Sequence, residues 1–271
     1  LVEFVSADPS GPLPFSLGRA AAAGDTLCRL LTLQGAEVTR EFYLNDDISS
    51  SRVRLLGESV AAAYGREFDS ELPLPEGALQ GDFVRAVARD IAGAEGNAFL
   101  LVPEAERTAR FAKIAAAAAR VSQQKTLRAF GVRFDVWTSE SVLRQDGRIE
   151  AILGRLEERG HTYREGGALW LRTTAFGDEA DRTLVRAGGD STYLAADIAY
   201  HVFKFERGFD TVFNIWTAEH RQYIERTKAA LAAAGADTGR LEVVACEGAR
   251  WLVDGVPVSR GRDGSAFSLD E

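Results

Sequence analysis

The N-terminal part of the chain has a strand–helix–strand pattern, which restricts the possible folds more than any other feature of the sequence. Residues 2–7 form a short apolar run, residues 17–34 place leucines and alanines at helical spacing before Gly35, and residues 36–44 alternate as in a strand. A helix that joins two strands within about 40 residues makes the strands parallel. We therefore predict an α/β fold built on a parallel sheet.

A second pattern of the same kind occupies the C-terminal part. Residues 197–207 have helical spacing, and residues 209–216 are typical of a buried strand. Residues 219–234 are predicted to form a helix that ends at Gly235, and residues 241–246 a further strand. The two ends of the chain are therefore predicted to be the halves of one Rossmann-like, doubly wound parallel sheet.

The middle of the chain has a different pattern. Residues near 80–130 are helical in character and rich in alanine, and residues 161–176 have the Gly-Gly turn and the flanking alternation of a β-hairpin. This order predicts a mixed α+β insertion between the two halves. The expected domains are a first half over 1–70, the insertion over 71–188 and a second half over 189–271.

Charge and composition argue against several classes of protein. The chain of 271 residues has 32 basic and 40 acidic residues, and its net charge of −8 disfavours nucleic-acid binding over a broad surface, although it allows a local basic patch. No apolar run approaches the roughly 20 residues of a membrane span, and the N-terminus lacks the pattern of a secretion signal. We expect a cytoplasmic protein without a membrane partner. Cys28 and Cys246 suggest neither a disulfide framework nor a zinc site.

The loop "SADPSGPLPFSLGR", residues 6–19, follows the first predicted strand and leads into the first predicted helix. Open parallel sheets bind ligands beyond the carboxyl ends of their strands, where the strand order reverses. The N-terminus of a helix at that place offers N–H groups and a positive dipole end to an anion. The position therefore suits a nucleotide, but the loop has no lysine or histidine.

Three sequence runs carry a family resemblance: "VEFVSADPSGPL", "WLRTTAFGDEADRTLVR" and "DIAYHVFKFERGFD". Together with the segments between them, they resemble the catalytic domain of bacterial arginyl-tRNA synthetases, in the same order and over essentially the whole chain. The resemblance implies a class I synthetase fold that activates arginine with ATP and transfers it to tRNA. We expect a truncated paralogue, without an N-terminal tRNA-binding domain or a helical anticodon-binding domain.

The resemblance also implies two nucleotide-binding motifs, and both are degenerate in this chain. The HIGH-type motif, with its two histidines and its glycine, falls on residues 14–17, and the KMSK-type loop falls on 259–262. A third departure lies at 216–221, where the family has "WGADHH". Removal of one preorganised transition-state donor costs about 3 to 4 kcal/mol, so little adenylation is expected. The degenerate positions are Pro14, Phe15, Ser16, Leu17, Glu219, His220, Arg260 and Arg262.

The family's pocket for the arginine substrate is better preserved. Position by position, the resemblance assigns it to Glu3, Ser6, Asp8 in place of an asparagine, Tyr193 and Asp197. Carboxylates can recognise a planar guanidinium in bidentate fashion. Each residue also has a structural interpretation, because Asp197 could begin a helix, Glu3 could be a solvated strand residue and Tyr193 a half-buried aromatic.

Other polar residues are predicted to be structural. We expect no metal site, because metal-ligand spacing is absent among the histidines His161, His201 and His220. A solvated helix end is expected for Lys204, Glu206 and Arg207. No cofactor is predicted, and the binding of ATP is left open.

Three functions remain open at this point. The leading hypothesis is a protein that has lost normal aminoacylation and binds arginine or a similar small cation in a binding or regulatory role. The second is a divergent ATP-dependent ligase in which Arg260 and Arg262 serve the pyrophosphate and the acceptor is not tRNA. The third is an interaction module for a synthetase or for tRNA, although the net charge argues against tRNA as an independent partner. The sequence predicts no oligomeric state.

Overall fold

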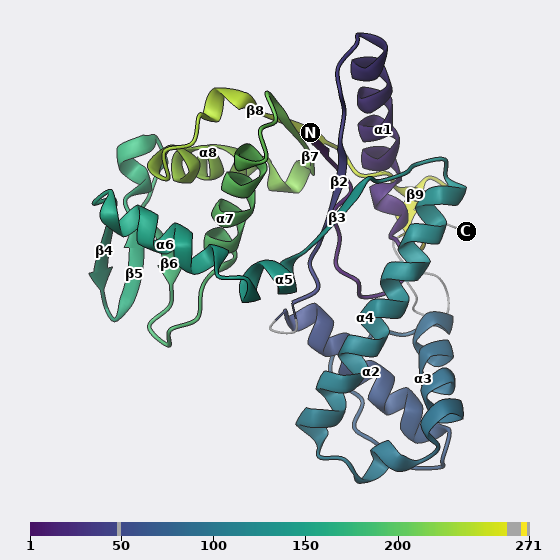
Figure 1. Cartoon of the computed structure of the whole chain (residues 1–271). Helices are drawn as coiled ribbons and strands as arrows, with labels where there is room; N and C mark the ends of the chain where they lie inside the picture. Colours follow the sequence, from purple (N-terminus) through teal and green to yellow (C-terminus); the bar gives the residue numbers. More distant parts are fainter. Residues whose placement is uncertain (48–49, 259–266, 270–271) are drawn as a thin grey trace. The chain divides into compact units, whose positions relative to one another are not determined.

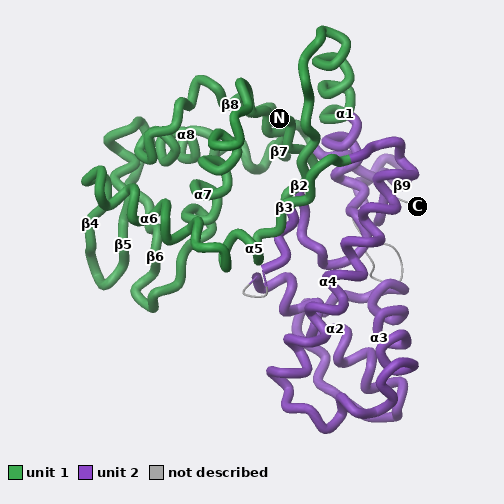
Figure 2. Tube along the Cα trace, viewed as in Figure 1, with its two compact units in different colours: residues 1–5, 23–43, 134–247 green, residues 6–22, 44–133, 248–271 purple. Residues whose placement is uncertain are grey.

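The chain forms two compact units that are interleaved along the sequence. The computed structural model describes residues 1–47, 50–258 and 267–269. Figure 2 shows unit 1, made of residues 1–5, 23–43 and 134–247, and unit 2, made of residues 6–22, 44–133 and 248–271. The three-part division predicted from the sequence stays a prediction, and each unit is described by itself.

A five-stranded sheet forms the centre of unit 1 (Figure 1). Its strand order is β3-β2-β1-β7-β8, and the pairs β1–β2, β1–β7 and β7–β8 are parallel. The sequence reaches β1 first and then builds outwards on both of its sides, which is the doubly wound order. The predicted α/β fold with a parallel sheet is therefore confirmed. The strands are β1 Val2–Glu3, β2 Arg40–Leu44, β3 Val136–Ser139, β7 Val212–Thr217 and β8 Leu241–Cys246.

Strand β1 is shorter than the apolar run predicted, because the backbone turns away after Phe4. Val5 and Ser6 have φ angles of 70° and 41°, in the left-handed region that β-branched residues rarely adopt. The expected strand over residues 2–7 is therefore wrong beyond Glu3. Left-handed residues of this kind occur often beside ligand sites.

The helices of unit 1 pack through an apolar core that includes Leu156, Ile198, Leu231 and Val212. Helix α7 begins at Tyr193, four residues before the predicted start, because the Thr192 side chain caps it by accepting the amide of Ala195. The predicted helix over 219–234 begins as a 3₁₀ segment and becomes α-helical at Ile224. The bounds are α5 Glu140–Gln145, α6 Arg148–Glu158, α7 Tyr193–Glu206, η4 Ala218–Tyr223, α8 Ile224–Ala233 and η5 Thr238–Arg240.

A three-stranded antiparallel sheet completes unit 1 and confirms the predicted hairpin. Strands β4 Thr162–Glu165 and β5 Ala168–Leu171 are joined by Gly166 and Gly167, whose φ angles of 58° and 79° suit a two-residue hairpin turn. Strand β6 Arg182–Val185 pairs with β5, and η3 Thr173–Phe176 lies between them.

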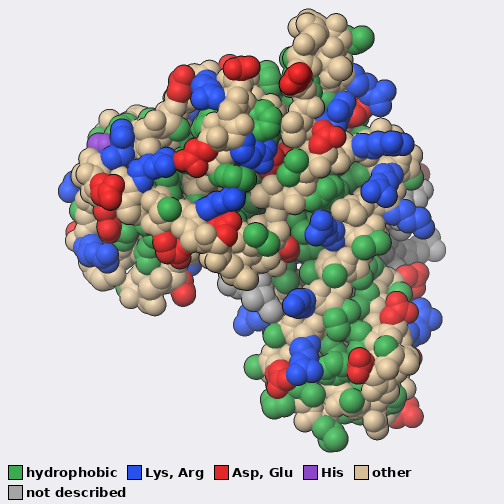
Figure 3. All heavy atoms as spheres, in the orientation of Figure 1, with side chains coloured by type: hydrophobic (Ala, Val, Ile, Leu, Met, Phe, Trp, Pro, Cys, Tyr) green, Lys and Arg blue, Asp and Glu red, His purple; other side chains and the backbone are tan. Residues whose placement is uncertain are grey.

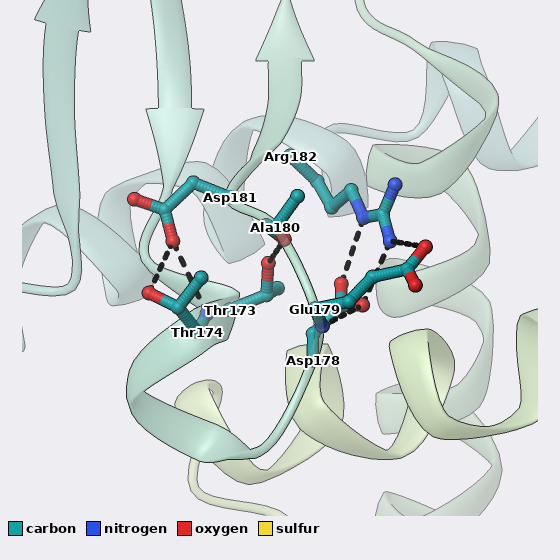
Figure 4. Close-up of polar contacts among 7 residues, drawn as sticks. All are labelled: Thr173, Thr174, Asp178, Glu179, Ala180, Asp181 and Arg182. Atoms are coloured by element: carbon teal, nitrogen blue, oxygen red, sulfur yellow. Dashed lines mark hydrogen bonds and ion pairs between the residues drawn. The ribbon is translucent and has the colours of Figure 1, made fainter.

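The loop between β5 and β6 is held by its own side chains (Figure 4). Arg182 donates two hydrogen bonds of 2.7 Å to Asp178, and these bonds hold the pKa of the Asp178 carboxyl below its usual range. Asp181 accepts hydrogen bonds from the amide and the hydroxyl of Thr174. The run "TTAFGDEADR" therefore has a structural role within this part of the chain.

Unit 2 is built around packed helices. Its core includes Leu56, Tyr64, Val87, Ile91 and Phe111. Among the described residues, none of the helices combines the length and the apolar content that a membrane crossing requires. The remaining bounds are η1 Phe15–Leu17, α1 Gly18–Leu33, α2 Ser51–Arg66, α3 Asp82–Glu95, η2 Ala98–Leu101, α4 Glu104–Ala129, β9 Trp251–Val253 and β10 Val256–Val258, with the unit boundary falling inside α1.

Close contact between α2 and α4 leads to a prediction at Gly57. A Cβ atom at this position would lie 2.4 Å from the carbonyl oxygen of Thr108. We expect Gly57→Ala to lower the free energy of unfolding by about 1 to 3 kcal/mol, although alanine is the better helix former. Gly93→Ala in α3 is the matched control, since nothing lies within 4 Å of its added Cβ. Urea denaturation should show the control equal to or more stable than the parent, and an equal decrease in both variants would contradict the packing argument.

Candidate functional site

Three polar residues lie side by side across the centre of the unit 1 sheet. In the strand register, Glu3 of β1 pairs with Glu41 of β2 on one side and with Asn214 of β7 on the other. All three are buried, and Glu41 and Asn214 have no exposed surface. Two neighbouring buried carboxylates repel each other and lose their hydration, so the fold must supply cations to both.

Helix α7 supplies the first cation through Lys204. Its ammonium group donates to Glu3 Oε2 at 2.5 Å and to Asn214 Oδ1 at 3.1 Å, and it lies 4.1 Å from the centre of the Tyr200 ring. Lys204 is fully buried. The expectation that it belongs to a solvated helix end is therefore wrong, because its partners come from strands distant in the sequence.

The second cation comes from Arg207, directly after α7. Its guanidinium donates to Glu41, which also accepts the Tyr200 hydroxyl at 2.8 Å and the Thr138 hydroxyl at 2.7 Å. Of the three residues expected at a solvated helix end, only Glu206 is exposed. Each buried carboxylate of the sheet is thus paired with a different cation.

His201 completes this network in its neutral form. The amide nitrogen of Asn214 can only donate, so it fixes His201 Nε2 as the acceptor at 2.6 Å, and Nδ1–H donates to the carbonyl of Asp197 at 2.8 Å. Burial, with the nearby Lys204 ammonium, lowers the pKa of His201 to about 3. The histidine therefore stays uncharged at neutral pH and links α7 to β7.

Asp197 is the acidic group that this network leaves without a cation. Its side chain is partly buried and has no hydrogen bond or ion pair to the described part of the chain. Burial, followed by the charges of Glu3 and Glu140, raises the pKa of Asp197 to about 7, against the opposing effects of Lys204 and Arg226. A ligand cation here would stabilise the ionised carboxylate.

Glu140 and Tyr193 border this acidic position. Glu140, at the start of α5, is buried and accepts two hydrogen bonds from Arg144, at 2.7 Å and 2.9 Å. Tyr193, four residues before Asp197 on α7, is 55% exposed, and the Arg144 guanidinium lies 5.9 Å from its ring centre. Glu140 was missed from the sequence, since nothing in its local pattern separates it from an ordinary first-turn glutamate. The charges of Glu3 and Glu140 act on Asp197. Glu3, Glu140, Tyr193 and Asp197 are called the acidic pocket below, as the position proposed for a ligand.

The other two predicted pocket residues belong to unit 2. Ser6 has the left-handed backbone described above, and Asp8 lies 3.8 Å from the Arg52 guanidinium. Burial raises the pKa of Asp8. The Gln123 amide fixes this loop by donating to the carbonyls of Asp8 and Gly11. Because the two groups of residues fall in different units, a joint pocket stays a prediction.

Residues 14–17 form the short η1 helix directly before α1. The amide of Phe15 donates to the carbonyl of Phe267 at 3.0 Å, and the amide of Leu17 donates to the carbonyl of Pro14 at 3.0 Å. A Cβ atom at Gly18 would lie only 2.8 Å from the Leu269 side chain. The amides of Phe15 and Leu17 therefore bond to the protein itself, and Ser16 has the only polar side chain among residues 14–17. The exposed Arg19 follows in the first turn of α1.

The remaining predicted nucleotide residues lie in different places. In η4 of unit 1, the Thr217 hydroxyl donates to Glu219 at 3.1 Å and lies 2.7 Å from His220 Nδ1, and both partners are exposed. Arg260 and Arg262 lie outside the described residues. The structure therefore describes only part of the predicted nucleotide site.

Comparisons with known proteins agree on one family. The chain is 40% identical over all 271 residues to the arginine–tRNA ligase of Geobacter sp. (strain M21), covering 49% of that protein. It is 43% identical over 242 residues, or 89% of its length, to the arginine–tRNA ligase of Bacillus subtilis (strain 168), covering 43% of it. The chain therefore spans about half the length of the curated relatives it matches. No family model matches the chain.

Solved structures agree with the sequence relatives. A Campylobacter jejuni protein assigned as an arginyl-tRNA synthetase superposes with a TM-score of 0.89 at 31% identity, over 99% of this chain and 58% of that one. The Thermus thermophilus arginyl-tRNA synthetase superposes with a TM-score of 0.73 over 99% of this chain and 50% of that one, and at 22% identity it supports the fold alone.

The buried Glu3–Lys204 pair generates a prediction about stability. We expect Lys204→Met to lower the free energy of unfolding by about 3 to 5 kcal/mol, because it leaves Glu3 buried without its cation. The double variant Glu3→Gln/Lys204→Met, which removes both charges, should recover much of that decrease. Urea denaturation followed by circular dichroism measures both. Equal stability of Lys204→Met and the parent would contradict the pairing.

Proposed function

We propose that this chain, which is homologous over its whole length to half of an arginyl-tRNA synthetase, binds arginine or a similar small cation in the acidic pocket of unit 1. The observation that carries the proposal is the partly buried Asp197 carboxylate, which has no cation of its own beside Glu3 and Glu140. The names of the relatives support arginine as the ligand.

Charge balance supports a cationic ligand. In the acidic pocket the charge of Lys204 balances that of Glu3, and the charge of Arg144 balances that of Glu140. No cation of the described residues lies within hydrogen-bonding distance of the Asp197 carboxylate. A guanidinium can donate two parallel hydrogen bonds to one carboxylate, which gives it an advantage over a compact ammonium. Tyr193 lies one helical turn before Asp197 and adds an exposed aromatic ring to the same side of α7.

We further propose that the chain does not perform normal aminoacylation. Residues 14–17 have no histidine, and the amides of Phe15 and Leu17 are already bonded to carbonyls of the protein. Preorganised donors of this kind supply a large part of transition-state stabilisation in a water-excluded site. These features favour a role in binding or regulation over one in adenylation.

The pH dependence of arginine binding tests the proposal. The ligand guanidinium keeps its charge throughout, so affinity depends on the ionised fraction of Asp197, whose pKa is about 7 in the free protein. Affinity should rise about tenfold between pH 6 and pH 8. Binding near pH 6 should release up to about one proton, because the cation lowers the pKa of Asp197. Calorimetry in buffers of different ionisation enthalpy measures both quantities.

Two variants make this experiment specific. Asp197→Asn should weaken binding and abolish both the pH dependence and the proton release. Glu206→Gln removes an exposed carboxylate from the same helix. It should leave the affinity, its pH dependence and the proton release unchanged. The proposal fails if the parent protein shows no binding heat with millimolar arginine, or if Asp197→Asn binds as the parent does.

A further inference from the structure

A hollow in unit 2 lies between α2, α3 and the loop that joins them. The two helices pack against each other (Figure 1), and residues 67–81 lead from the end of α2 to the start of α3. The hollow has a volume of about 70 Å³. Because one water molecule needs roughly 10 to 15 Å³, there is room for roughly five to seven groups of that size.

Hydrogen bonds within the protein hold the walls of this hollow. The Ser59 hydroxyl on α2 accepts the amide of Leu79 at 2.9 Å and donates to the carbonyl of Leu55 at 2.6 Å. The amide of Ser70 donates to the carbonyl of Gly65 at 3.0 Å, and a Cβ atom at Gly65 would lie 2.6 Å from the carbonyl oxygen of Ser70. The loop is thus fixed to α2 near both of its ends, and the hollow is preformed, as small-molecule sites usually are.

Apolar side chains form part of the lining. They are Ala63 of α2, Leu74 and Leu79 of the loop and Val84 of α3. Leu74 is 52% exposed, so a ligand that covered it would remove apolar surface from water. On the face of unit 2 drawn in Figure 3, hydrophobic side chains likewise reach the surface between charged ones. The hollow can therefore stabilise an aliphatic group.

Two arginines complete the lining, Arg66 near the end of α2 and Arg85 in the first turn of α3. Among the described residues that line the hollow, none is acidic. Arg66 is exposed and forms no ion pair with the described part of the chain. Arg85 pairs with Asp82 at 2.6 Å, but both side chains are exposed, and such pairs contribute little. The charge of the lining therefore favours an anion.

We propose that the hollow binds a short aliphatic carboxylate, with a chain of about four or five carbons. Such a molecule has about six or seven non-hydrogen atoms, which matches the space available. A guanidinium can donate two parallel hydrogen bonds to a carboxylate, and the aliphatic chain would cover the apolar lining. A bare inorganic anion would leave that lining in water. The site lies entirely within unit 2, and it selects the opposite charge from the acidic pocket.

Ligand-observed NMR with pentanoate tests the proposal on the whole chain. Pentanoate should bind with a dissociation constant in the millimolar range, as expected for so small a ligand. Pentanamide has nearly the same shape without the charge, and acetate has the charge without the aliphatic chain. Each should bind at least about tenfold more weakly than pentanoate, because it loses either the charge-assisted hydrogen bonds or the apolar contact.

The variant Arg66→Gln/Arg85→Gln removes both cations of the lining. It should weaken the binding of pentanoate at least about tenfold and leave the affinity for pentanamide unchanged. The matched control is Arg54→Gln/Arg89→Gln, which removes one exposed arginine from each of the same two helices, at positions outside the lining. This control should bind pentanoate as the parent does.

Thermal melting checks that the variants are folded. If the double variant in the lining is unstable, Arg66→Gln alone should still weaken pentanoate binding at least about threefold. The proposal is overturned if the parent does not bind pentanoate, or if pentanamide or inorganic phosphate binds as tightly as pentanoate. Equal affinity of the two double variants for pentanoate would also overturn it.

Discussion

Two buried carboxylates on neighbouring strands set the constraint on which unit 1 depends. Glu3 and Glu41 pair in register at the centre of the sheet, where their mutual repulsion and the removal of their hydration would oppose folding. Lys204 of helix α7 forms an ion pair with Glu3, and Arg207, directly after the helix, forms an ion pair with Glu41. Such pairs add little net stability over apolar residues, but here they connect α7 and the residue after it to strands β1 and β2. The position of α7 then fixes where Asp197 lies.

Asp197 is the acid for which the described residues provide no cationic partner, and we propose that this imbalance gives unit 1 an affinity for a cation. At the start of α1 in unit 2, by contrast, the amides of Phe15 and Leu17 bond to carbonyls of the protein, and residues 14–17 contain no histidine or lysine. We propose that the first set of residues binds a positive ligand, and that residues 14–17 lack the groups that stabilise a triphosphate during its cleavage. On this contrast we base the proposal that the chain binds arginine without activating it.

Local pattern predicted the elements well where one periodicity dominates. The helix over α1, the buried strands β7 and β8 and the Gly166–Gly167 hairpin were all expected from apolar spacing or turn chemistry. Strand β1 was predicted too long, because nothing local reveals the left-handed backbone at Val5. Lys204 looked like a solvated residue because its partners, Glu3 and Asn214, come from other strands. Asp197 was reached through family resemblance, whereas its lack of a cation required the structure.

Thermal melting with arginine alone, ATP alone and both together tests the central claim most directly. Because a ligand that binds only the native state raises the melting temperature by mass action, arginine alone should raise it. ATP should have no effect of its own and should add nothing to the effect of arginine. A melting temperature that rises with ATP alone, or that rises with arginine only when ATP is present, would contradict the account.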